Sequence, residues 1–442
     1  GISNRDFRFE SRRRWCHSDT APLHLLETQP NFIVSDSEKF YVEKINIFGN
    51  NITQENFIRH QLIVDEGDPF NVLLHNKSIN KLKSKGIFAS VESKIRNSSN
   101  DNQKIIDLTF EEKPTGEISA GAGYGTNGST FAVGIKENNF NGKGITLEAN
   151  LALTEETIKG LFKYTNPNFA YSERALSTSL ESTVTDKETE SGYKSSLNRV
   201  SLGTSYEQYE DLFFSPSLSI SSESLTTTSA ASANYKKQEG TYFDTIFSYV
   251  LTYDKRNSPY QPTDGFASRW VQDLPLVADG SPIMNGYSIT GYRELLDDMI
   301  VSLGFYGRAV NSLTGDDVRV SNRLYLPRSR LRGFEQGKVG PRDGLDYVGG
   351  NYITTINSSA TVPYILQTME NIDLKLFVDA ANIWGVDYSS TIDDSNKIRS
   401  SFGASLEVLT PIGPLSFSLA QPISKASTDV TESFRFQLGT TF

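Results

Sequence analysis

The chain has 442 residues, enough for one to three domains, and its formal net charge of −10 at pH 7 argues against nucleic acid as a partner. Its single cysteine, Cys16, excludes an internal disulfide, and the spacing of its four histidines suits no metal site. No run of about 18 apolar residues is present, which excludes a membrane-spanning helix but not a transmembrane barrel, where only every second residue faces lipid. Composition alone equally fits a soluble β-rich protein.

Residues 1–40 form no recognisable domain and are left unassigned. The run Arg12-Arg13-Arg14 makes the segment basic, and the segment shows neither a helical nor a strand period. We expect a disordered stretch or one foreign to the natural protein; a basic tail that touches anionic lipid is the alternative. No secretory signal peptide opens the chain, so we expect that this signal has been removed or that the chain is a fragment.

Residues 41–114 have the pattern of one small α/β domain. Gly49-Asn50 marks a turn after the first strand, Thr53 stands where the N-cap of a helix is expected, and Gly86 ends a second helix. The order β-α-α-β-β in this segment is enough for one small core. The predicted elements are a strand at 41–48, helices at 54–64 and 72–85, and strands at 88–95 and 104–111.

Residues 115–442 are predicted to form a second domain without helices, which makes the chain mainly β. Along 145–153 and again along 372–379, apolar residues alternate with polar ones. In the second run the polar face includes Asp373 and Asp379, which a sandwich core would not tolerate but a watery lumen would. At roughly 20 residues per strand and loop, the domain would supply about 16 strands of an antiparallel transmembrane β-barrel. The Ser/Thr/Asp-rich stretches 221–232 and 387–397 are predicted to be loops outside the membrane.

The last ten residues alternate up to the C-terminus and end on an aromatic residue. An unpaired terminal strand of this kind would invite aggregation, whereas in a barrel it pairs with the first strand. We take 117–126 as that first strand; glycines share one of its faces, which leaves the seam with little side-chain packing. Either the seam is a weak point of the barrel, or the glycines relieve crowding against a loop inside it, and both can hold. The predicted seam residues are Gly121, Gly123, Gly125, Phe434, Phe436, Leu438 and Phe442.

Several motifs together resemble one family of membrane proteins. The segments 42–50 and 66–71, Val-Glu-Lys-Ile-Asn-Ile-Phe-Gly-Asn and Glu-Gly-Asp-Pro-Phe-Asn, are similar to the last POTRA domain of the bacterial outer-membrane barrel-assembly proteins. Leu331-Arg332-Gly333-Phe334 is similar to the Arg-Gly-Phe signature of that superfamily, which includes the mitochondrial Sam and chloroplast Toc barrel channels. The resemblance covers about 41–442. The other matching segments are 164–169, 262–266, 340–342, 349–351 and 410–415.

The resemblance assigns the Arg-Gly-Phe motif a place inside the barrel. In the family the motif lies at the tip of a loop folded into the lumen, here at about 322–350, and its arginine contacts acidic residues on the barrel wall. Arg332 would be that arginine and Asp379 its partner, in a bidentate, charge-assisted contact. At 358–361 the sequence Ser-Ser-Ala-Thr replaces the family's glutamate, so the resemblance supplies no second acidic partner. Without the resemblance, Arg332 reads as a solvated arginine in a flexible loop.

The resemblance implies a protein that folds and inserts β-barrel proteins into the bacterial outer membrane, as the central subunit of an assembly machinery and without catalytic residues, cofactor or metal. Its POTRA domain would lie in the periplasm and hold a client strand by β-augmentation, while the seam would open as a template for strands. The implied partners are unfolded outer-membrane proteins, outer-membrane lipid and the lipoproteins of the machinery. The alternative is a protein-translocating pore of the two-partner secretion or autotransporter-assembly type.

Overall fold

The structure is a computed structural model that describes residues 39–442 apart from 126–127, 173, 189–191, 230, 260, 280–281, 345, 363–371, 388–391, 393–395, 411–412 and 439–442. The predicted seam residue Phe442 and nearly all of the unassigned stretch 1–40 therefore lie outside the described residues. The chain divides into two compact units. Among the described residues these are 39–115 with Asn141–Gly144, and Gly116–Phe140 with 145–438.

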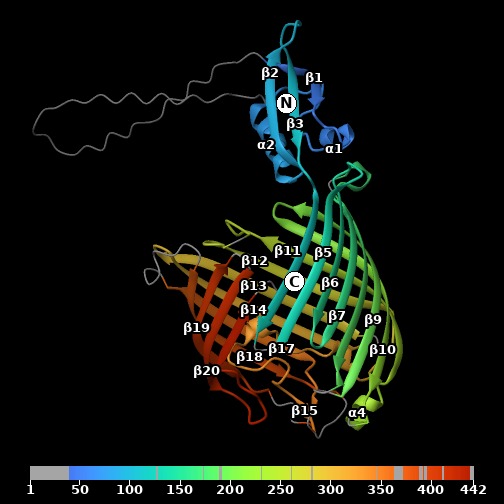
Figure 1. Cartoon of the computed structure of the whole chain (residues 1–442), viewed down its shortest axis with the longest axis vertical. Coiled ribbons are helices and arrows are strands. Elements are labelled where there is room, and N and C mark those ends of the chain that lie inside the picture. The colour runs from blue at the N-terminus through green and yellow to red at the C-terminus, as the bar shows by residue number, and fades with distance from the viewer. Residues whose placement is uncertain are drawn as a thin grey trace, which may run out of the picture. The chain divides into compact units, whose positions relative to one another are not determined.

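The first unit is a three-stranded mixed sheet with two helices (Figure 1). Its strand order is β1-β3-β2, so that the last strand takes the centre, parallel to β1 and antiparallel to β2. The predicted order β-α-α-β-β is confirmed. The elements are β1 (Tyr41–Phe48), α1 (Glu55–Arg59), α2 (Val72–Ser84), β2 (Phe88–Asn97) and β3 (Gln103–Glu112).

The core of the first unit lies between the sheet and its helices. On the central strand, Ile106 and Leu108 are almost completely buried, because alternate residues of a strand point to one face. Ile58 from α1 and Leu82 from α2 are fully buried against them in the same cluster. Each such side chain contributes about 1.5–3 kcal/mol when it leaves water, so the sheet and helices stabilise one another.

The first helix differs from the prediction of 54–64. It ends at Arg59, and Gln54 rather than Thr53 occupies its N-cap position. At the start of the helix a tertiary contact takes the place of the expected cap: the backbone N–H groups of Ile52 and Thr53 donate to the two oxygens of Glu112, at 2.8 and 2.6 Å. Burial alone would raise the pKa of Glu112, but these hydrogen bonds outweigh it and lower the pKa.

Acidification should destabilise the first unit through His75. Its imidazole Nε2 lies 2.8 Å from the hydroxyl of Ser93, and burial lowers the pKa of His75 below its ordinary value of 6.5. The unfolded chain therefore binds the proton first, so stability is full above about pH 6.5 and falls as the pH drops through the lowered pKa, by about 1.4 kcal/mol per unit of depression.

Urea unfolding of residues 39–115 at pH 7.5 and 5.5 checks this expectation. Wild type should lose stability over that interval, and His75→Gln, which cannot titrate, should lose less. Equal losses in the two proteins would mean that carboxylates such as Glu112, and not His75, set the pH dependence.

The second unit is a closed barrel of 16 strands, which confirms the predicted antiparallel barrel (Figure 1). Every strand is antiparallel to both neighbours, and β21 meets β4 to close the wall. Among the described residues no helix has the length and apolar character needed to cross a membrane. The strands are β4 (Gly116–Gly125), β5 (Gly128–Phe140), β6 (Ile145–Thr154), β7 (Thr157–Asn166), β8 (Ala175–Lys187), β9 (Tyr193–Tyr209), β10 (Leu212–Thr227), β11 (Gly240–Asp254), β12 (Gly265–Ala278), β13 (Pro282–Leu296), β14 (Met299–Ser312), β17 (Tyr352–Thr361), β18 (Ile372–Trp384), β19 (Arg399–Thr410), β20 (Gly413–Ser424) and β21 (Phe434–Leu438).

The two faces of the wall differ as the alternation predicts. On β18, Leu376 and Val378 are 54% and 53% exposed, whereas the intervening Phe377 and the following Asp379 are 3% and 0% exposed. The exposed residues point outward, where a membrane barrel meets lipid, and the buried ones point into the lumen. A segment between β14 and β17 covers them there.

The stretch 221–232 is not the loop that the sequence predicts. Strand β10 continues to Thr227, and the short helix α4 (Ala233–Lys236) follows. Its Ser- and Thr-rich composition hides a regular alternation, because Glu223 and Leu225 are buried on the lumen side while small polar residues take the outer side. The prediction of a loop from small polar residues is wrong for 221–227, because strand β10 continues past the part of the wall whose outer face is apolar.

Candidate functional site: the inward loop and the barrel seam

The connection between β14 and β17, residues 313–351, folds into the barrel and is called the inward loop from here on. It contains two short 3₁₀ turns, η2 (Val320–Asn322) and η3 (Arg328–Arg330), and the small strand pair β15 (Arg342–Asp343) and β16 (Asp346–Tyr347). Its apolar residues pack against inward-facing residues of the wall. This cluster comprises Val310, Val318, Leu324, Leu326, Leu331, Phe334, Val339, Ile353, Ala381 and Ile383.

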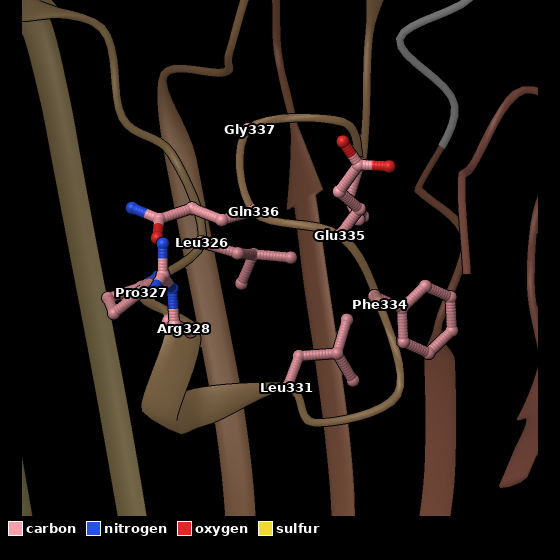
Figure 2. A pocket seen from close by; sticks show the side chains of 9 residues that line it. Leu326, Pro327, Arg328, Leu331, Phe334, Glu335, Gln336 and Gly337 are labelled. Carbon is pink, nitrogen blue, oxygen red and sulfur yellow. The ribbon is translucent and has the colours of Figure 1, made fainter. Parts of the chain in front are cut away.

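The tip of the inward loop is a tight turn that buries two apolar side chains. Leu331 and Phe334 are almost fully buried, and Figure 2 shows Leu331 within the curl of the segment while Phe334 points to the other side of it. Between them Gly333 has φ +90°, and a Cβ on it would stand 3.0 Å from the Cβ of Ala420 on β20. Glycine adopts a positive φ without strain and has no Cβ to approach Ala420. The backbone conformation and the close packing therefore both favour glycine at position 333.

Arg332 binds Asp379 on β18 through both ends of its guanidinium. Nε lies 2.7 Å from Oδ2 and Nη2 lies 2.8 Å from Oδ1, and the backbone N–H of Arg332 also donates to Oδ2, at 3.1 Å. The guanidinium carbon is 3.5 Å from the centre of the Phe377 ring, which adds a cation–π contact. Because Asp379 is completely buried, this pair is shielded from water and is stronger than a surface ion pair.

A neutral residue, Asn357, also binds the carboxylate of Asp379. Asn357 on β17 donates to Asp379 Oδ1 and to the backbone carbonyl of Arg330, both at 2.8 Å. Ser359, one of the residues that replace the family's glutamate, instead contacts Ser302 across the wall, at 2.7 Å. The amide of Asn357 thus connects the inward loop to the same carboxylate that binds Arg332. Among Arg332, Asp379 and Asn357 there is one positive and one negative charge.

A second arginine holds the first part of the inward loop to the opposite stretch of wall. Arg319 donates to Glu223 on β10 at 2.8 Å and to Asp244 on β11 at 3.0 and 3.2 Å. Its guanidinium also lies over the Tyr242 ring, 4.0 Å from the centre. All three charged side chains are at least nine-tenths buried. The hydroxyl of Ser195 donates a further hydrogen bond to Glu223, at 2.6 Å.

A third contact fixes the end of the loop. The backbone N–H of Gly340 donates to Asp429 at 3.1 Å, and Arg399 on β19 holds the same carboxylate at 3.0 Å. Further back, Arg323 donates to Asn351 at 3.0 Å and pairs with Asp387. The inward loop is therefore tied to the wall at several levels by charge-assisted hydrogen bonds.

The seam joins β21 to β4. Two of its register pairs are described, Gln437 with Gly125 and Leu438 with Tyr124, and residues 126–127 and 439–442, which follow these two strands, lie outside the described residues. Phe434 and Phe436 pair with Leu419 and Phe417 on β20.

Gly121 and Gly123, two other predicted seam residues, pair with Ala132 and Thr130 on β5. The residues after Leu438 lie outside the described residues, so the seam side of these two glycines is not described. Of the predicted seam residues, the structure thus brings Gly125 and Leu438 to the described join. Asn357, Arg319, Glu223 and Asp244 were not singled out from the sequence, since their partners become neighbours only through the register of the strands.

A closed barrel with a loop bound in its lumen, preceded by a β-α-α-β-β unit, defines the class of outer-membrane barrel proteins with POTRA domains. The Omp85 superfamily domain matches residues 139–442, and a POTRA model described as surface antigen variable number repeat matches residues 40–113. The chain belongs to the Omp85 superfamily. The barrel lies in the outer membrane and the POTRA domain in the periplasm.

Relatives point to one branch of this superfamily. The chain is 25% identical to the outer membrane protein assembly factor BamA of Neorickettsia risticii over 92% of this chain and 56% of that protein, and 24% identical to BamA of Neisseria meningitidis over 95% and 59%. The crystal structure of BamA from Haemophilus ducreyi lacking POTRA domains 1–3 superimposes with a TM-score of 0.81 at 26% identity, covering 93% of this chain and 86% of that one. The chain spans a little more than half the length of these curated relatives.

Proposed function

We propose that this protein folds and inserts β-barrel proteins into the outer membrane as the central subunit of a barrel-assembly machinery. The observation that supports this role is the closed barrel in which the last strand, β21, meets the first, β4, preceded in the chain by a POTRA domain. A strand edge without partners leaves N–H and C=O groups unsatisfied, which costs several kcal/mol for each group in hydrocarbon. An opened seam would therefore favour pairing with an incoming strand, and the protein would need neither catalytic residues nor a cofactor.

The POTRA domain would hold the client before insertion. Its sheet order leaves β2 as an edge strand, to which an extended client segment can add by backbone hydrogen bonds. Unfolded outer-membrane proteins are thus the proposed clients, and the lipoproteins of the machinery and outer-membrane lipid the proposed partners. A pore that exports a passenger through the lumen is the rival role, and the tied inward loop speaks against an open lumen.

Locking the seam should abolish insertion. Tyr124→Cys with Leu438→Cys places two thiols on a described register pair, within the Cα separation that disulfides span, in a Cys16→Ser background. The oxidised protein in liposomes should fold an unrelated unfolded barrel protein no faster than empty liposomes do, and reductant should restore the acceleration. The measurement is the rate at which the client becomes protected from protease.

A matched disulfide inside the wall controls for general stiffening. Ser302 and Ser359 face one another on β14 and β17, so Ser302→Cys with Ser359→Cys locks a join far from the seam in sequence. This control should insert clients at the unlocked rate. Full insertion by the locked seam would refute the proposal, and absent insertion with a large channel conductance in the unlocked protein would identify the transport pore instead.

A further inference from the structure

Two hollows of similar size on the described outer face of the barrel each lie over a glycine in a strand. One lies over Gly291 on β13 with a volume of about 680 Å³, and the other over Gly160 on β7 with a volume of about 640 Å³. A Cβ added at Gly291 would meet nothing closer than 4.0 Å, and one at Gly160 nothing closer than 3.9 Å. In both places a missing side chain leaves room beside strands that otherwise pack closely.

The hollow over Gly291 faces away from the lumen. The register places Gly291 beside Phe266 on β12 and Leu303 on β14, so these three share one face of the wall. Leu303 is 61% exposed, whereas a Cβ on the next residue, Gly304, would stand 3.7 Å from the side chain of Arg330 in the inward loop. The face of Gly304 is therefore the lumen side, and the face of Gly291 meets the membrane.

At the rim of this hollow lie an arginine and an aspartate that still have hydrogen-bonding groups available for a ligand. Arg293, two residues after Gly291 on the same face, approaches Asp264 with Nη1 at 3.3 Å from Oδ1. The side chains are 75% and 59% exposed, so this single contact leaves guanidinium donors and one carboxylate oxygen open to solvent or lipid. The pair lies at the end of the barrel where β4 begins at Gly116, which is the periplasmic end.

The hollow over Gly160 lacks such a rim. Its outward neighbours include Ser182 and Asn198, which bond to each other at 2.9 Å. The charged residues beside it, Glu181 and Arg199, alternate onto the inner face, where Glu181 pairs with Lys159 at 3.2 Å. The two hollows thus have similar volumes, and each lies over a glycine. They differ because only the hollow over Gly291 has a charged pair, Arg293 and Asp264, on the outer face beside it.

We propose that the hollow over Gly291 binds one zwitterionic phospholipid with an ethanolamine headgroup. The acyl chain fills the space beside Phe266 and Leu303, the phosphate takes the free donors of Arg293, and the ammonium group lies against Asp264. A headgroup of one negative and one positive charge complements an arginine–aspartate pair, and an anionic headgroup without an ammonium does not. The site depends on the barrel's place in the outer membrane and on no step of strand insertion.

Native mass spectrometry of the full chain in detergent micelles tests the site. With equal amounts of phosphatidylethanolamine and phosphatidylglycerol of the same acyl chains, wild type should retain one phosphatidylethanolamine in preference. Gly291→Leu, which fills the hollow, should lower that retention about tenfold, a change of about 1.4 kcal/mol, and Gly160→Leu should leave it unchanged. Arg293→Gln should lower the retention of both lipids, and Asp264→Asn should remove the preference for phosphatidylethanolamine over phosphatidylglycerol.

Several results would overturn the proposal. Equal losses in Gly291→Leu and Gly160→Leu would mean that lipids coat the wall without a defined site. Stronger retention of phosphatidylglycerol by wild type would exclude the ammonium contact at Asp264. Heat-modifiable migration on gels verifies that each barrel is folded, and Arg293→Gln and Asp264→Asn, whose side chains are exposed, supply the test if Gly291→Leu does not fold.

Discussion

Arg332→Ala should release the tip of the inward loop and slow client insertion at least tenfold. The substitution leaves Asp379 buried without its bidentate partner, and removing one member of a buried ion pair costs about 3–5 kcal/mol. The freed tip would expose Arg328 and Arg330, so trypsin should cut the loop in the folded barrel. The liposome insertion rate and the tryptic pattern measure the two consequences.

Two further variants separate charge from geometry at this position. Arg332→Lys keeps the positive charge but cannot bond both carboxylate oxygens in a planar fork, so it should fall between wild type and alanine. Arg332→Leu with Asp379→Leu removes both charges and should recover barrel stability without restoring the tip's position. If Arg332→Ala inserts clients and resists trypsin as wild type does, the anchor has no part in the function.

Arg319→Gln should open the lumen to ions. It leaves Glu223 and Asp244 as two buried carboxylates without a cation, and their desolvation and mutual repulsion push the first part of the inward loop away from β10 and β11. Single-channel conductance in planar bilayers should rise several-fold. The tip at Arg332 should stay protected from trypsin, because its own contacts are untouched.

The control for this prediction is another arginine of the lumen. Arg199 on β9 faces inward but is 38% exposed and lies 4.0 Å from Glu181, so Arg199→Gln should change conductance little. Adding Glu223→Gln and Asp244→Asn to Arg319→Gln removes the uncompensated charges and should return conductance toward wild type. Unchanged conductance in Arg319→Gln would show that the other ties hold the loop alone.

The strand pattern and the charged lumen face could be read from the sequence because both follow from period-two alternation. The alternation along 372–379 is enough to place Asp379 on the polar face, and a family motif singles out Arg332; the two side chains meet in the structure. The start of the first helix could not be placed from local signals, because Glu112, distant in sequence, takes the N–H groups of Ile52 and Thr53.

The contacts of Arg319 with Glu223 and Asp244 could not be predicted from the sequence for a different reason. Glu223 lies in a Ser-rich stretch that reads as a loop, and Asp244 becomes its neighbour only when β10 and β11 pair in one register. Asn357 is a comparable case, since nothing in its local sequence distinguishes it until β17 lies beside β18 and brings it to Asp379. Register across the wall, and not residue type, decides these contacts.

The ties of the inward loop also order the events by which this barrel itself forms. Arg332 and Asp379 are 47 residues apart in the chain, and Arg319 and Glu223 are 96 apart. Contacts of such long sequence separation are slow to form, because the intervening chain must be ordered before they can be made. The tip cannot dock until β18 is in place beside β17, so loop docking is a late step that only a nearly complete wall allows. The contact between Arg332 and Asp379 would therefore be a marker for the late stage at which β17 and β18 are already paired.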